Sequence, residues 1–173
     1  MAARIARSSN ELARAVAAAL ALATTSAIAD SPHIVGEPSI IVTGTTGDLV
    51  CSWKESGLGI SATAETGVCS ASASATYACV TKSGTVPAGA KKLMLAGPLA
   101  TSNTLTVGTR NGQATFTIVL NPPSGDNLAC PNGQTLELAG TSYTSVVVAD
   151  TTAEISTPIA GTFTSSCLLQ SGC

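Results

Sequence analysis

Nine carboxylic side chains that follow residue 29 are the groups in this sequence best suited to hydrolytic chemistry. A glycoside hydrolase needs two of them about 5–9.5 Å apart, one as an acid and one as a base or nucleophile. Acids scattered along a chain more often lie on the surface, where they keep it soluble. The sequence therefore favours surface acids and keeps a two-carboxylate hydrolase as an alternative. The nine are Asp30, Glu37, Asp48, Glu55, Glu65, Asp126, Glu137, Asp150 and Glu154.

Other catalytic signatures are missing from the sequence. The single histidine, His33, lies in a proline-flanked lead-in, so a Ser-His-Asp or Cys-His arrangement would have to pass through that loop. GxSxG, HExxH, the phosphate-binding GxxxxGK[ST] and GxGxxG do not occur, and neither does a DxDxDG calcium loop. We therefore expect no enzyme activity, no cofactor and no metal, and assign no catalytic residue.

Two aromatic residues, Trp53 and Tyr77, are the candidates for ligand binding, because flat aromatic rings stack on sugars. Trp53 alternates with Leu49 and Cys51, which favours a place in the core beside a disulfide. A carbohydrate- or small-ligand-binding module is thus a second alternative, and it requires both rings to be exposed on one flat face.

Six cysteines, an even number, indicate disulfides in an exported chain. The alternative, a zinc site, lacks a CxxC pair and a nearby histidine. Six cysteines allow fifteen connectivities, among which the sequence does not choose. Our working assignment is Cys69–Cys79, Cys51–Cys130 and Cys167–Cys173.

Residues 1–29 have the pattern of a secretory signal peptide. Arginines lead into the apolar run Ala15–Ala23, and Ala27-Ile28-Ala29 fits a signal-peptidase site, so cleavage is expected after Ala29. The run is too short to span a membrane, and no second apolar span follows. Residues 30–173 then form a single secreted domain. This region has five Lys and Arg against nine Asp and Glu, a net charge of −4, which argues against nucleic-acid partners.

The strongest local signal is Asn111-Gly112, a dipeptide typical of a two-residue hairpin turn. A hairpin folded there pairs Arg110 with Gln113 and places Val107 opposite Phe116. It also places Leu105 opposite Ile118, so the apolar side chains share one face. The sequence therefore predicts a two-stranded ribbon over 103–120.

Eight to ten short strands with turn signals between them predict an all-β fold. We expect strands over 76–81, 134–138 and 142–149, and a loop or sheet edge over 66–74. The fold class is an antiparallel β-sandwich, Ig-like or a similar Greek key, held by disulfides.

Three stretches, GDLVC at 47–51, CPNGQTLEL at 130–138 and SYTSVVVADTT at 142–152, resemble small secreted β-domain proteins of actinobacteria. That family has no assigned activity, so the resemblance implies a secreted β domain and supplies no catalytic residue. The expected function is a non-catalytic extracellular domain with an interaction or cell-envelope-associated role. A cell-wall glycan or a protein is the expected partner.

Overall fold

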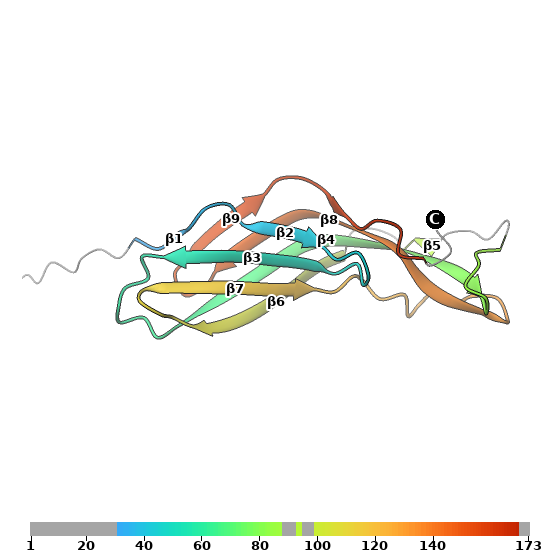
Figure 1. Ribbon diagram of the computed structural model, residues 1–173, viewed down its shortest axis with the longest axis horizontal. Helices are drawn as coiled ribbons and strands as arrows, with labels where there is room; N and C mark the ends of the chain where they lie inside the picture. The colour runs from blue at the N-terminus through green and yellow to red at the C-terminus, as the bar shows by residue number, and fades with distance from the viewer. Residues whose placement is uncertain (1–30, 88–92, 95–98, 170–173) are drawn as a thin grey trace, which may run out of the picture. The chain divides into compact units, whose positions relative to one another are not determined.

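The computed structural model describes residues 31–87, 93–94 and 99–169, which belong to one compact unit, Ser31–Cys173 (Figure 1). The predicted signal peptide and its cleavage site lie outside the described residues. Within them the chain forms strands and turns, and none of it is a helix long and apolar enough to cross a membrane. The strands are β1 (His33–Ile34), β2 (Ser39–Val42), β3 (Leu49–Ser56), β4 (Ala64–Thr81), β5 (Leu93–Met94), β6 (Leu99–Gly108), β7 (Gln113–Leu120), β8 (Gln134–Asp150), β9 (Ile155–Ile159) and β10 (Phe163–Thr164).

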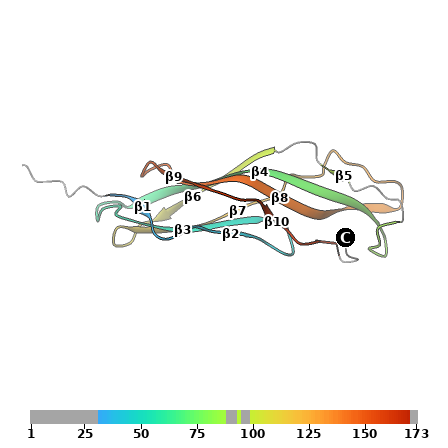
Figure 2. The same ribbon diagram turned by 90° about the horizontal axis from the view of Figure 1, so that it is seen from above.

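The strands form two antiparallel sheets, which confirms the all-β prediction (Figure 2). In sheet A, β3 pairs with β7 on one side and with β1 and β2 on the other. In sheet B, β4 pairs with β8 on one side and with β5 and β6 on the other, and β8 also pairs with β9 and β10. The two sheets share one apolar core, to which both contribute buried side chains.

Strict alternation of side chains defines the core-facing surface of each central strand. Every second residue of β7 is buried, from Ala114 to Leu120, and β3 alternates in the same way from Leu49. Because successive side chains of a strand point to opposite faces, these patterns fix the register of both strands. The Trp53 and Phe116 rings stack at the centre of the core, with centroids 4.7 Å apart.

Strands β4 and β8 are much longer than predicted, and each joins segments that the sequence analysis kept apart. The region 66–74, expected as loop or edge, continues without a break into 76–81 as β4. The segments 134–138 and 142–149 are likewise one strand, β8. The reason is visible in Ala71, Ala73 and Ala75, which are buried and alternate with half-buried serines. Ala and Ser alternate here with the period of two typical of a strand. Both are weak strand formers, so the sequence did not indicate a strand at this position.

A β-bulge at Ser145 changes which residues of β8 face the interior. Before it the buried residues have odd numbers, such as Tyr143, and after it they have even numbers, such as Val146 and Val148. The register against β4 shifts by one residue at this point, and Ser145 adopts φ of 51°. An extra residue of this kind is what reverses the alternation of a strand.

Substitutions at Ser145 should separate backbone strain from side-chain loss. We expect Ser145→Val to lower the free energy of unfolding by about 1–2 kcal/mol, since a β-branched residue is strained at positive φ. Ser145→Gly should match or exceed the wild type, because glycine adopts this conformation freely. Urea denaturation of the oxidised protein measures both. Equal losses in the two variants would contradict a strained bulge.

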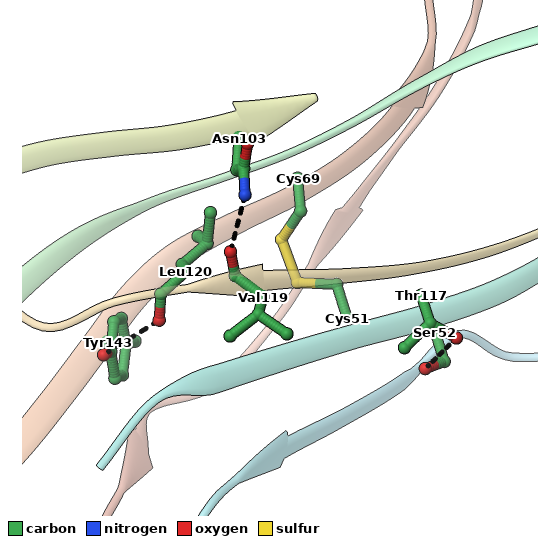
Figure 3. The surroundings of a disulfide bond; sticks show 8 residues. All are labelled: Cys51, Ser52, Cys69, Asn103, Thr117, Val119, Leu120 and Tyr143. Carbon is green, nitrogen blue, oxygen red and sulfur yellow. Dashed lines mark hydrogen bonds between the residues drawn. A yellow bond between two sulfur atoms is a disulfide. The ribbon is translucent and has the colours of Figure 1, made fainter. Parts of the chain in front are cut away.

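The disulfide pairings differ from the working assignment. Cys51 of β3 pairs with Cys69 of β4 across the two sheets (Figure 3). Cys79 pairs with Cys130. Cys69–Cys79 and Cys51–Cys130 are therefore wrong. The physical reason is that β4 is continuous: ten residues of extended strand hold Cys69 and Cys79 about 33 Å apart. Cys167 is also disulfide-bonded, but its predicted partner Cys173 lies outside the described residues.

The turn at Asn111-Gly112 forms as predicted, but the ribbon does not continue from it. Asn111 and Gly112 both have positive φ, and the Arg110 and Gln113 backbones exchange two hydrogen bonds of 2.8 and 3.1 Å. Beyond that bridge the strands separate, with β6 joining β4 in sheet B and β7 joining β3 in sheet A. The predicted pairs, Val107 with Phe116 and Leu105 with Ile118, are wrong as ladder partners. The turn is instead the point where the chain changes sheets.

Candidate functional site

Three carboxylic side chains meet inside the fold, at the end of the sheets where β3 and β8 finish and β4 begins. Glu55 lies on β3, Glu65 on β4 and Asp150 on β8, and all three are at most 4% exposed. The pairing places Asp150 opposite Gly67, two residues from Glu65 on the same strand face. The alternation of β3 directs Glu55 inward, in line with Trp53. We call these three residues the carboxyl cluster.

Glu55 Oε1 and Asp150 Oδ1 of the carboxyl cluster accept hydrogen bonds. The Trp53 indole N–H donates to Glu55 Oε1 at 2.6 Å. The backbone N–H groups of Thr152 and Ala153 donate to Asp150 Oδ1 at 2.7 and 3.0 Å and so fix the turn after β8. The other oxygens, Glu55 Oε2, Glu65 Oε2 and Asp150 Oδ2, receive no hydrogen bond from a donor within the described segments.

The surroundings of the two glutamates favour their neutral, protonated forms. Burial, together with the nearby Asp150 and Glu65, raises the pKa of Glu55 to about 7, although the Trp53 hydrogen bond works against the increase. Burial and Asp150 also raise the pKa of Glu65. Neutral carboxyl groups can donate O–H to Asp150, which removes the cost of three buried negative charges. Burial and the neighbouring carboxyl groups thus disfavour the charged forms of Glu55 and Glu65.

The carboxyl cluster is enclosed and is not arranged as a catalytic pair at an opening. Hydrolysis requires substrate between two carboxyls, whereas these groups are almost fully covered by the protein. In the segments that the structure describes, no group of three acidic, histidine or cysteine side chains is suited to hold a metal ion. The arrangement can bind and release protons, and its direct effect is on the stability of the fold.

The two candidate aromatic residues lie in different surroundings. Trp53 is 4% exposed and stacks on Phe116, as the core interpretation predicted. Tyr77 is half-buried on β4, and its hydroxyl donates to the Pro123 carbonyl at 2.7 Å. Burial, followed by the nearby Asp126, raises the pKa of Tyr77. The flat exposed pair that ligand stacking requires is not formed by these rings.

His33, the only histidine, lies on the exposed face of β1, as expected for a lead-in residue. Its Nδ1 is 2.8 Å from the Ser31 carbonyl, and its Nε2 is 2.9 Å from Ser56 Oγ. Both ring nitrogens are engaged: Nδ1 within the lead-in and Nε2 with Ser56 of β3.

A second feature is the outer edge of β6, which pairs with no strand in the part of the chain that the structure describes. The Thr66 backbone bonds toward the end of β8, through Thr152 Oγ1 at 3.2 Å and Thr151 N at 2.9 Å. Its neighbours Glu65 and Gly67 must then bond toward β6, because alternate residues of a strand use opposite edges. Their partners on β6 are the odd-numbered residues.

The even-numbered backbones of β6, those of Ser102, Thr104 and Thr106, consequently point away from β4. The Thr104 N–H donates to the adjacent Asn103 Oδ1 at 2.9 Å, in keeping with that direction. Across a shallow groove of about 230 Å³, Asn103 Nδ2 donates to the Val119 carbonyl of β7 at 2.9 Å (Figure 3). We call the row formed by the even-numbered backbones the β6 edge.

The β6 edge lacks the features that usually prevent a sheet edge from pairing with another chain. Its strand has ten residues, with no charged side chain and no proline. On the far side of sheet B, β9 has five residues and contains Pro158, and β10 has two. Short strands, prolines and charges are the common protections of exposed edges. The two sides of sheet B are therefore unequal, and only the β6 side is long and unguarded.

Apolar side chains next to the β6 edge are also uncovered. Leu99 and Leu105 point to the core side of sheet B, opposite Ala73 and Gly67 of β4. They nevertheless remain 48% and 39% exposed, because β7 turns away with sheet A. This surface was not predicted from the sequence, because β6 was expected to pair with β7.

The three acids of the carboxyl cluster were expected on the surface. Their inward placement depends on the register between strands that are far apart in the chain, which the sequence does not reveal.

Comparison of the chain with family models, with curated proteins and with solved structures found no match.

Proposed function

We propose that this chain is a secreted, non-catalytic domain that interacts with other chains through strand addition at the β6 edge. The observation that carries the proposal is the contrast between the long uncharged β6 edge and the short, proline-marked edge at β9. Free N–H and C=O groups along an edge accept an extended strand, and adjacent pockets select its side chains. The exposed Leu99 and Leu105 supply the apolar contacts next to this ladder.

The described residues give neither alternative from the sequence a supporting geometry. A two-carboxylate hydrolase requires acids that line a cleft, but the carboxyl cluster is enclosed, although the raised pKa of Glu55 matches one of its criteria. A sugar-binding module requires exposed aromatic faces, but the Trp53 ring is buried against Phe116. An interaction domain uses neither group.

The finer details of fold and location belong to the same proposal. A disulfide between the two sheets next to a buried tryptophan is in keeping with an Ig-like sandwich. Disulfides persist in oxidising compartments, so the bridges support export by a signal peptide cleaved after Ala29. The resemblance to secreted actinobacterial β domains then suggests a role at the cell envelope, with a protein or a wall glycan as partner.

Site-specific photo-crosslinking in the producing culture tests the proposed function. A photoreactive phenylalanine analogue replaces Thr104 on the exposed face of β6, and in a matched control it replaces Ser156 on the exposed face of β9. We expect a protein adduct from position 104 and none from position 156. Equal labelling at both positions, or none at either, would contradict interaction through the β6 edge. An adduct with polysaccharide alone would favour the glycan-binding alternative.

A further inference from the structure

We propose that the partner at the β6 edge is a second copy of this chain, joined by antiparallel pairing of β6 with itself about a two-fold axis at Ser102. This inference rests on the proposed function of the β6 edge and specifies the strand that it accepts. Three features of β6 favour this pairing: the polarity of its backbone, the positions of its uncovered leucines and its lack of charge.

The backbone polarity allows an axis at Ser102. In an antiparallel ladder, residues that exchange both hydrogen bonds must each direct N–H and C=O toward the partner. Ser102 belongs to the even-numbered set of β6 that points away from β4, as the hydrogen bonds of Thr66 and Thr104 indicate. Ser102 can therefore bond with its own copy. Pairing of Ala100 with Thr104 of the second copy requires the Thr104 N–H to exchange its hydrogen bond to Asn103 Oδ1 for one across the interface.

The same axis pairs the two exposed leucines. Counting three residues in each direction from Ser102 reaches Leu99 and Leu105, which lie on the core side of sheet B and are 48% and 39% exposed. Antiparallel pairing about Ser102 places Leu99 of each copy opposite Leu105 of the other. These positions form non-hydrogen-bonded pairs, in which side chains approach most closely. A single register thus aligns the outward-facing backbone groups of the two copies and covers Leu99 and Leu105 in each copy.

The lack of charge makes β6 compatible with itself. On a two-fold axis a residue faces its own copy, so a charged side chain at position 102 would face a like charge. No residue from Leu99 to Gly108 carries a charge. Sheet B would then run continuously through both copies. The interface is small, which indicates reversible association.

Analytical ultracentrifugation of the mature oxidised protein, from micromolar to millimolar concentration, tests self-pairing. We expect a concentration-dependent dimer in the wild type. Ser102→Lys places two ammonium groups opposite each other and should weaken association roughly tenfold or more. The matched control, Ser156→Lys on the guarded edge, should associate as the wild type does. A wild type that stays monomeric throughout, or a dimer unaffected by Ser102→Lys, would overturn the proposal.

A second variant, which introduces a pair of opposite charges, tests the pairing register. It also provides a test if Ser102→Lys folds poorly. Position 104 of one copy faces position 100 of the other in the proposed ladder. The double variant Ala100→Glu/Thr104→Lys should therefore associate more tightly than Thr104→Lys alone, by up to about fivefold. Equal association of the two variants would contradict an axis at Ser102. A monomeric wild type that still gives a heterologous protein adduct from position 104 would refute self-pairing and leave the proposed function standing.

Discussion

Raising the pH from about 5 to 8 should destabilise the oxidised protein by about 2.5 kcal/mol, most of the effect of moving the pKa of one carboxyl group from 4.5 to about 7. The folded state keeps a proton on Glu55 up to about pH 7, whereas an unfolded chain releases it near the ordinary pKa of 4.5. Stability is therefore greatest below about pH 4.5 and is lost as the pH rises through 7. Glu65 acts in the same direction, because its pKa is also raised. Urea denaturation at a series of pH values measures the slope.

Glu55→Gln should remove most of this pH dependence. The amide remains neutral at every pH, accepts the Trp53 N–H and donates to Asp150 in place of the carboxyl proton. At pH 8 the variant should be more stable than the wild type. The control is Glu137→Gln on the exposed face of β8, which should leave the slope unchanged. Stability that rises with pH in the wild type, or an equal slope in Glu55→Gln, would contradict a proton-holding cluster.

Adding one methyl group at Gly67 should lower the free energy of unfolding by about 1–3 kcal/mol through overpacking. Gly67 faces the core between Glu65 and Cys69, and the Phe116 ring lies directly over it. A Cβ at this position would be 2.4 Å from Phe116 Cδ1, so the ring must move, and its stacking on Trp53 opposes that movement. Thermal or urea unfolding of Gly67→Ala measures the loss.

Two comparisons isolate the clash at Gly67. Gly44→Ala adds the same methyl group where no atom lies within 4 Å, and it should cost little. In a double-mutant cycle, Phe116→Leu should reduce the cost of Gly67→Ala, because the branched side chain can withdraw from the new methyl group. Additive losses would show that the ring is not the cause.

The sequence predicted what depends on local chemistry. Alternation in 113–120 and 49–53 gave both strands and their buried faces, and Trp53 lies in the core as its neighbours indicated. The Asn111-Gly112 turn formed because both residues adopt positive φ at low cost. These features need only the residue types and a period of two.

The parts that the sequence did not predict depend on contacts between distant segments. A turn specifies a reversal of the chain, but it does not specify whether the two strands remain paired, and here β6 and β7 gain more by joining different sheets. The disulfide pairing followed from the unexpected length of β4. Glu55, Glu65 and Asp150 come together only because three strands bring them to the same buried region of the fold. No spacing within a single segment reveals this.

Residue-resolved amide hydrogen exchange along β6, in dilute solution and at high protein concentration, tests the open edge most directly. In dilute solution we expect slow exchange at Asn103, Leu105 and Val107, whose amides face β4, and fast exchange at Ser102 and Thr106, whose amides face outward. Ser102 should become protected as the concentration rises. Slow exchange at all five positions in dilute solution would mean that β6 is already paired on both sides, and it would contradict the account.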